Sequence, residues 1–190
     1  MVRYLVFDTE TTGLPKFSRK SYVYARNWPD LVSICWVVLD GDNEVKRRYY
    51  IIQPNGWTIP DEAAKIHGIT MEKAVALGEP LRVVLNELRE DLKTADKIVA
   101  HNMNFDRNVL LHAYYWRLRD DPARFWPNKK EVCSMLRATA PTDKWIRLDD
   151  LYERSIGQKP PADAHNAERD VNVLIAIIKK LWSGNDYSDL

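Results

Sequence analysis

Short apolar runs separated by turn residues dominate the first part of the chain. Residues 4–7 form an apolar run that ends at Asp8, and residues 31–39 form a second run rich in valine and isoleucine. A Gly-Asp-Asn turn follows the second run, and residues 45–52 then alternate loosely between apolar and polar positions. Short β-branched runs bounded by turns are typical of strands. We therefore expect a hairpin over residues 31–52, with the first strand beside it.

Apolar residues at helical spacing dominate the rest of the chain. Positions three and four residues apart that share an apolar character predict amphipathic helices. Residues 97–100 form a short apolar run that predicts a buried strand. Residues 121–130 carry two prolines and predict a loop. The expected helices cover residues 61–66, 70–77, 80–92, 104–118, 148–155 and 166–182.

Strands followed by helices that enclose one further strand predict an α/β domain with a mixed sheet. A chain of 190 residues suits one domain over residues 1–190. Its least regular stretch, at about residues 15–29, mixes basic and aromatic residues and reads as an insertion. Two interpretations of this insertion stay open: it holds a nucleic-acid strand or a partner, or it is a packed surface loop.

Charge and cysteine content limit the classes of function. The 28 basic and 27 acidic residues nearly cancel, so a nucleic-acid role must depend on a local site rather than on a large positive field. Cys35 and Cys133 form no CxxC pair, which argues against a zinc site and a disulfide framework and favours the cytoplasm or nucleus. The charge-free apolar run at residues 31–39 is far below the roughly 20 residues that a membrane helix needs.

The first candidate site is a pair of acids at the end of the first strand. Asp8 and Glu10 are two residues apart, so both carboxylates point to the same side of a strand. Strand ends of α/β sheets are where ligands bind, and a divalent cation would relieve the repulsion between two like charges. A solvated strand end without any ligand is the alternative for this pair taken alone.

Two further acids lie on predicted helices. Asp106 shares a helix face with the apolar Leu110 and Ala113, which places its carboxyl group on the inward side. Asp170 borders the apolar stripe of the last helix. If His165 shares a site with Asp170, it must lie in the loop before that helix, because it would otherwise point to the opposite side.

Four inward carboxylates from one strand and two helices would be costly to bury without a compensating charge. Ligation by oxygen atoms alone suits Mg²⁺ or Mn²⁺ better than zinc. Two such ions, about 3.5–4 Å apart, stabilise the attacking and leaving oxygens of a phosphoryl displacement. The four acids therefore indicate a site for two divalent metal ions and phosphoryl-transfer chemistry.

Three sequence segments, together and in this order, resemble a known family. FDTETTG at residues 7–13, HNMNFD at residues 101–106 and HNAERD at residues 165–170 are similar to the three motifs of the DEDDh exonucleases. This family is the DnaQ-like group of the ribonuclease H-like superfamily. IHGIT at residues 66–70 also resembles a family segment, and the likeness runs from residue 4 to about residue 181.

The resemblance implies a ribonuclease H-like mixed sheet flanked by helices, and a metal-dependent 3′-5′ exonuclease. Asp8, Glu10, Asp106 and Asp170 would hold two ions, Mg²⁺ or Mn²⁺, and His165 would be the general base. The products would be nucleoside 5′-monophosphates cut from a 3′ end. The resemblance further implies contacts to the terminal nucleotide from Thr11, Leu14, His67, Met103 and Phe105.

The chain departs from the family pattern at Ser33, where the family often carries Glu or Gln. Single-stranded or frayed DNA is the expected substrate, and RNA 3′-end processing is the alternative within the enzyme class. A nucleic-acid end-binding or scaffolding module with little activity is the alternative of another class. A protein partner and a homodimer both stay open, and no membrane association is expected.

Overall fold

The computed structural model describes residues 2–18, 20–126, 130–139, 144–162 and 165–182. The described strands form one sheet in the order β3-β2-β1-β4-β5. β1 pairs antiparallel with β2, and β2 with β3, whereas the β1–β4 and β4–β5 pairs are parallel. The sheet is therefore mixed, as predicted. Its strands are β1 (Arg3–Thr11), β2 (Leu31–Asp40), β3 (Asn43–Ile51), β4 (Lys97–Ala100) and β5 (Lys130–Cys133).

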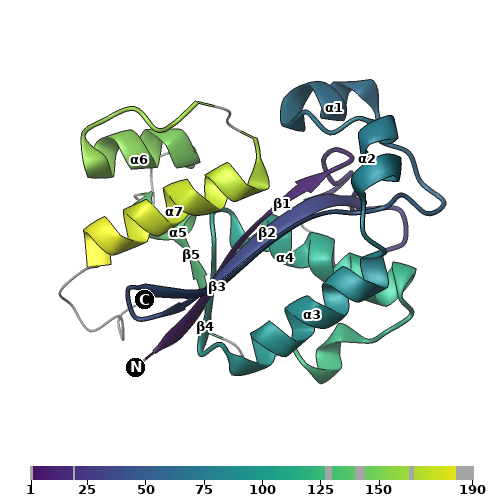
Figure 1. Cartoon of the computed structure of the whole chain (residues 1–190), viewed down its shortest axis with the longest axis horizontal. Helices are drawn as coiled ribbons and strands as arrows, with labels where there is room; N and C mark the ends of the chain where they lie inside the picture. The colour runs from purple at the N-terminus through teal and green to yellow at the C-terminus, as the bar shows by residue number, and fades with distance from the viewer. Residues whose placement is uncertain (1, 19, 127–129, 140–143, 163–164, 183–190) are drawn as a thin grey trace.

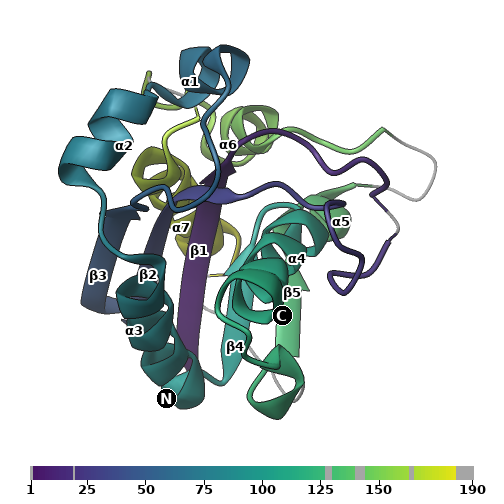
Figure 2. The ribbon, with the colours of Figure 1, turned by 90° about the vertical axis from the view of Figure 1, so that its right-hand side faces the viewer.

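Helices cover both faces of this sheet (Figures 1 and 2). α3 and α4 pack on one face, α7 packs on the other, and α6 lies against the outer side of α7. The short α1 and α2 close the end of the β2–β3 hairpin. The helices are α1 (Asp61–His67), α2 (Met71–Leu77), α3 (Leu81–Thr94), α4 (Met103–His112), α5 (Ser134–Ala138), α6 (Leu148–Ile156) and α7 (Ala167–Trp182).

The alternation of side chains along β1 divides the core into two layers. Leu5 and Phe7 belong to the apolar cluster that β1 shares with α3 and α4, whereas Tyr4 and Val6 belong to the cluster under α7. Both layers are dry, because all four side chains are at most 1% exposed. The same alternation continues into the polar end of the strand, where Asp8 follows Val6 on the α7 side.

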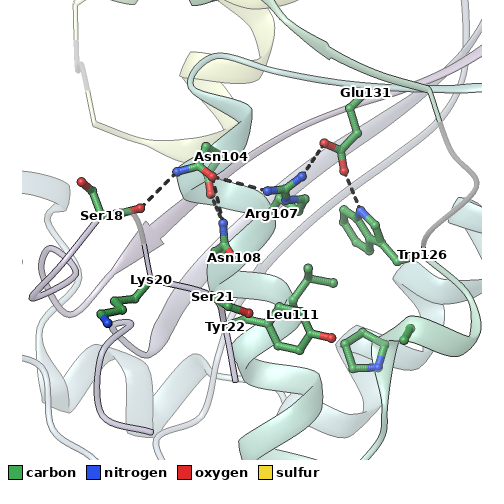
Figure 3. Close-up of a pocket in the computed structure, with 12 residues that line it drawn as sticks. Ser18, Lys20, Ser21, Tyr22, Asn104, Arg107, Asn108, Leu111, Trp126 and Glu131 are labelled. Atoms are coloured by element: carbon green, nitrogen blue, oxygen red, sulfur yellow. Dashed lines mark hydrogen bonds and ion pairs between the residues drawn. The ribbon is translucent and has the colours of Figure 1, made fainter. Parts of the chain in front are cut away.

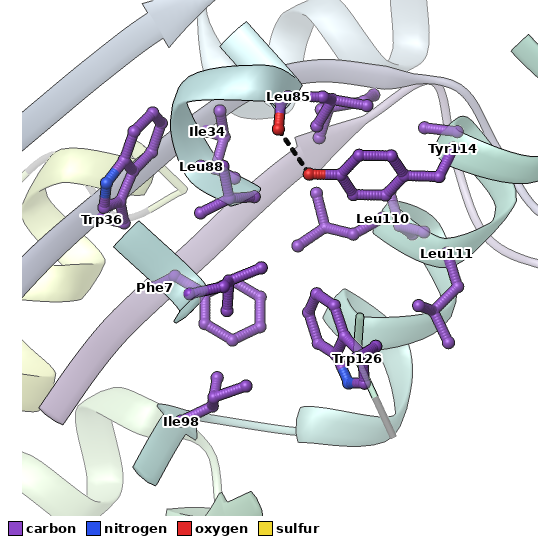
Figure 4. Packing of buried hydrophobic residues seen from close by; sticks show 14 of the residues in the cluster. Phe7, Ile34, Trp36, Leu85, Leu88, Ile98, Leu110, Leu111, Tyr114 and Trp126 are labelled. Carbon is purple, nitrogen blue, oxygen red and sulfur yellow. Dashed lines mark hydrogen bonds between the residues drawn. The ribbon is translucent and has the colours of Figure 1, made fainter. Parts of the chain in front are cut away.

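Large aromatic side chains fill the layer beneath α3 and α4 (Figure 4). The rings of Phe7 and Trp126 meet edge to face with centroids 6.4 Å apart. Tyr114 donates its hydroxyl hydrogen bond to the carbonyl of Leu85, so this buried polar atom is satisfied. Trp36 is fully buried, and its indole N–H donates to the Asp91 carboxylate at 2.7 Å.

β4 is much shorter than β1, and this leaves one edge of β1 open. The β1–β4 pairing runs only from Tyr4↔Lys97 to Val6↔Val99, while β1 continues to Thr11 against β2 alone. α4 begins at Met103, directly after β4, and its first turn lies beside the unpaired end of β1. The carboxyl end of β1 is therefore a place where a helix side chain can reach the strand backbone.

Three local predictions were wrong. The helix expected over residues 104–118 ends as α at His112 and continues as a π-helix over Ala113–Arg117. β5 and α5 were missed, because the KEVC sequence of β5 has one fully buried side chain, Val132, and no alternating pattern. β5 exists through its pairing with β4, a contact between segments about thirty residues apart that local periodicity does not reveal.

Gly78 ends α2 where the chain packs against the backbone of Gln53. A Cβ atom at this position would lie 2.3 Å from the carbonyl oxygen of Ala74 and 2.5 Å from the amide nitrogen of Gln53. We expect Gly78→Ala to lower the free energy of unfolding by about 2–3 kcal/mol, because backbone atoms must move to admit the methyl group.

Gly56→Ala is the matched control in chemical denaturation. Gly56 has a positive φ of 73° but no atom within 4 Å of the added carbon, so it carries backbone strain alone. That strain costs about 1 kcal/mol. A loss at Gly78 no greater than the loss at Gly56 would contradict the packing argument.

Candidate active site

Asp8 and Glu10 occupy the side of β1 that faces α7. Asp170, in the first turn of α7, meets them there. One carboxylate oxygen of each of the three residues lies within 4.8 Å of the others. The predicted same-side placement of Asp8 and Glu10 is confirmed, and the last helix adds the third carboxylate.

Asp106 approaches from α4, around the open edge of β1. Its Oδ1 accepts two hydrogen bonds from Thr9, one from the backbone N–H at 3.1 Å and one from the hydroxyl at 2.7 Å. The Thr9 N–H points to the side that β4 leaves unpaired, so Asp106 satisfies a donor that no strand reaches. Asp106 is 2% exposed, which confirms that its helix face is the inward one.

His165 lies immediately before α7, where the sequence places it if it shares a site with Asp170. Its side chain is exposed, and its backbone adopts a left-handed conformation with φ of 63°. Asn102, immediately before α4, has a similar φ of 68°. Such conformations are uncommon for residues other than glycine and persist where the surrounding structure enforces them. Two of them therefore border the same group of carboxylates.

A cavity of about 620 Å³ unites the site. The four acids and His165 all line it, together with Thr11, Leu14, His67 and Phe105. Met103 does not, because its side chain is 4% exposed and packs in the core under α4. The structure thus places four of the five expected nucleotide-contact residues around one cavity.

His67 presents a hydrogen-bonding group without a protein partner among the described residues. Its Nδ1 accepts a hydrogen bond from the backbone N–H of Ile69 at 3.2 Å, and its buried Nε2 has no partner. Burial lowers the pKa of His67 and favours the neutral ring. With Nδ1 acting as acceptor, the proton resides on Nε2. The backbone of Thr11 interacts with the ring and opposes part of the lowered pKa.

The sequence analysis missed residues 145–148, which line the cavity just before and at the start of α6. Trp145 is 69% exposed, and nothing in its local sequence marks it. His101 positions this segment: one ring nitrogen lies 2.8 Å from the Ser134 hydroxyl and the other 3.0 Å from the Ile146 carbonyl. A carbonyl only accepts, so Nε2 carries the proton and Nδ1 accepts from Ser134.

The insertion at residues 15–29 packs on the body of the protein through part of its side chains. Asn27 bonds both the N–H and the carbonyl of Phe17, and Trp28 is buried in the core. Lys16 and Lys20 are exposed. A second cavity of about 810 Å³ lies between this segment and α4 (Figure 3). A nucleic-acid or partner contact made by residues 15–29 stays a prediction.

A family model described as an exonuclease, RNase_T, matches residues 5–178. The chain belongs to the RNase_T exonuclease family. This match confirms the resemblance to the DEDDh exonucleases as a family. No curated protein shows significant similarity to the chain.

Solved exonuclease I structures share the fold of this RNase_T domain. The zinc-bound Escherichia coli exonuclease I–ssDNA complex matches with a TM-score of 0.73 at 19% identity, over 95% of this chain and 40% of that one. Exonuclease I from Methylocaldum szegediense gives 0.71 at 22% identity, over 94% and 40%. The predicted ribonuclease H-like fold is confirmed, and the chain spans about 40% of the length of these relatives.

Burial and mutual repulsion raise the pKa values of the carboxylates in this RNase_T site. Burial, then Asp170 and Asp106, raises the pKa of Glu10 to about 8. Burial raises that of Asp106 to about 7 against the opposing bonds from Thr9. The pKa of Asp8 lies well above its usual range for the same reasons. Among the described residues, Arg169 alone forms an ion pair with any of the four acids, at Asp170.

These acids fit divalent cations. They offer oxygen atoms in a partly enclosed cavity, and their charge exceeds what the neighbouring basic groups neutralise. Both cysteines are free, and neither lines the cavity. No described helix has the length and apolar character to cross a membrane.

In the absence of metal, the free energy of unfolding should fall as the pH rises from about 4 to about 8. In this range the acids of the folded protein still hold protons that the same acids of the unfolded chain have released. Mg²⁺ binds the deprotonated carboxylates, so its stabilising effect should grow with pH. Thermal unfolding at about pH 5 and about pH 8, in EDTA and in millimolar Mg²⁺, measures both effects.

Asp8→Asn is the diagnostic variant for this experiment. It removes one of the crowded charges, so it should raise the metal-free unfolding temperature at the higher pH and abolish most of the shift with Mg²⁺. An Mg²⁺ effect that is equal at both pH values and survives in Asp8→Asn would place the ion elsewhere.

Proposed function

We propose that the chain is a metal-dependent 3′-5′ exonuclease that hydrolyses phosphodiester bonds at 3′ ends and releases nucleoside 5′-monophosphates. The observation that carries this proposal is the convergence of Asp8, Glu10, Asp106, Asp170 and His165 on one cavity in a member of an exonuclease family. The acids come from β1, α4 and α7, so the whole fold contributes to the site.

Asp8, Glu10, Asp106 and Asp170 would hold two divalent ions, Mg²⁺ or Mn²⁺. When bound, these ions would supply Lewis-acid stabilisation of the charge that develops on the attacking and leaving oxygens. Asp106 keeps Oδ2 for this purpose, because both Thr9 bonds go to Oδ1. The Thr9 bonds also fix the direction of that carboxylate and reduce the cost of its burial.

His165 would act as the general base. Its exposure admits water, and a neutral imidazole accepts a proton near pH 7. In the proposed step, water loses a proton to His165 while its oxygen forms the new bond to phosphorus. The bond between phosphorus and the 3′ oxygen of the preceding nucleotide breaks, and that oxygen takes a proton from solvent.

Exposed apolar side chains around the cavity suit a substrate of variable sequence. Leu14, Ile66 and Trp145 are 84%, 58% and 69% exposed, and they come from three separate segments around the cavity. Stacking and apolar contact accept any base, which an exonuclease requires. Thr11, Phe105 and the Nε2–H of His67 would add contacts to the terminal nucleotide.

Single-stranded or frayed DNA is the substrate we favour. The likeness to exonuclease I structures solved with ssDNA and with a dT13 oligonucleotide supports this choice for the chain. RNA 3′-end processing is the alternative within the same chemistry, and an inactive end-binding module is the alternative of another class. The proposed location is the cytoplasm or nucleus, and a protein partner or homodimer stays open.

Cleavage of 5′-labelled oligonucleotides tests the activity and the substrate together. Matched single-stranded DNA and RNA are incubated with Mg²⁺, Mn²⁺ or EDTA, and we expect a metal-dependent ladder that shortens from the 3′ end. Asp8→Asn should lower the rate at least about 100-fold, because a group that stabilises charge in the transition state is lost.

Asp40→Asn is the acid control, since Asp40 pairs with Arg3 at the far end of β1. It should cleave at the wild-type rate. Faster cleavage of RNA would move the proposal to an exoribonuclease, and tight substrate binding without any product would favour the binding module.

Trp145 provides a separate test of the substrate contact. Trp145→Ala should raise KM about 10-fold through the loss of one stacking contact, with a smaller change in kcat. Trp145→Phe should retain most of the affinity. Leu136→Ala serves as the control, because Leu136 is also exposed, at 58%, but lies outside the cavity. An unchanged KM in Trp145→Ala would exclude Trp145 from substrate binding.

A further inference from the structure

Arg169 joins three parts of the site through one half-buried guanidinium group. Its side chain is 10% exposed and lies in the first turn of α7, beside Asp170. Nη1 donates to Asp170 Oδ1 at 2.7 Å and to Asp149 Oδ1 at 2.5 Å. Nε and Nη2 both donate to the carbonyl of Pro161, at 3.1 and 2.6 Å.

Each of these acceptors belongs to a different segment around the cavity. Asp149 is in the first turn of α6, next to Leu148, which lines the cavity. Pro161 precedes His165 in the connection between α6 and α7. Asp170 is one of the three carboxylates whose oxygens lie together. The guanidinium therefore fixes a helix, a connecting segment and a metal-binding candidate relative to one another.

The backbone at His165 gives this connection a specific importance. A left-handed conformation at a residue other than glycine is retained only when neighbouring contacts hold it. The paired bonds from Arg169 fix the carbonyl of Pro161 beside the start of α7. On the other side, Asn166 accepts hydrogen bonds from the N–H groups of Glu168 and Arg169 and anchors the start of α7.

We infer that Arg169 is a positioning residue, which orients the Asp170 carboxylate for metal binding and ties it to Asp149 of α6 and to the carbonyl of Pro161. This inference rests on the proposed exonuclease function. Arg169 donates to one oxygen of Asp170, so Oδ2 keeps its lone pairs for a cation. The pair with Asp149 offsets part of the positive charge that would otherwise oppose a cation at this place.

Lysine cannot replace this arrangement. A guanidinium is planar and presents donors in several fixed directions, whereas an ammonium group is a single point charge on a flexible stem. Arg169→Lys therefore keeps the charge while it removes the simultaneous bonds to Pro161, Asp149 and Asp170. The variant separates the geometry of the contact from its electrostatic contribution.

The experiment compares the wild-type chain, Arg169→Lys and Arg3→Lys. Arg3 makes a similar two-bond contact with Asp40 at the opposite end of β1, so Arg3→Lys controls for the loss of an arginine pair. Three quantities are measured: kcat and KM on single-stranded DNA with Mg²⁺, the Mn²⁺ dissociation constant by calorimetry without substrate, and the thermal unfolding midpoint.

We expect Arg169→Lys to lower kcat and weaken Mn²⁺ binding, each by about 10-fold or more, as for other residues that orient metal ligands. KM should change little, because Arg169 makes no proposed contact with the nucleotide. Arg3→Lys should match the wild type in all the kinetic and binding values. A purely structural Arg169 would lower the unfolding midpoint alone, and that outcome would overturn the inference.

Two further outcomes are distinguishable. If Arg169→Lys fails to fold, Asp149→Ala removes one acceptor of Arg169 and should give a smaller loss of kcat and Mn²⁺ affinity; wild-type values in that variant would refute the inference. If the wild-type chain cleaves no substrate, the proposed function fails. The Mn²⁺ titration of wild type and Arg169→Lys then still decides whether Arg169 orients Asp170.

Discussion

The site depends on the contact between Asp106 and Thr9. β4 ends early, so the outer part of β1 has a strand on one side only, and its backbone donors on the other side need acceptors. Asp106 meets this need for Thr9 with two hydrogen bonds to one oxygen. A carboxylate is thereby brought to the edge of the strand whose other residues, Asp8 and Glu10, already face Asp170.

The same cluster of acids lowers the stability of the fold. Four carboxylates converge where Arg169 alone among the described basic residues pairs with one of them. Their raised pKa values record the cost of burying them and, second to that, of the repulsion from neighbouring acids. The rest of the core compensates, since apolar layers under α3, α4 and α7 hold β1 from both faces. The acids are thus kept close together by packing that lies elsewhere in the molecule, which is how many proteins retain a strained site.

The residue pattern was sufficient for most of the fold and for the acids of the site. The alternation at Asp8 and Glu10 and the inward face at Asp106 are properties of a single strand or helix, so one segment reveals them. β5 was not predicted, because its pairing with β4 defines it. Trp145 was not predicted as a cavity residue, because His101, far away in the sequence, positions the segment around it. Nothing in the local sequence singles out Arg169, since its three acceptors come together only in the folded chain.

The origin of the acids on β1, α4 and α7 has a consequence for biosynthesis. During translation, β1 and α4 emerge long before residue 170, and the segment with β5, α5 and α6 must be added before α7 can cover the sheet. Contacts between residues so distant in sequence form late in folding. A nascent chain therefore carries an incomplete set of carboxylates, and the proposed nuclease site is complete only once the last helix has docked.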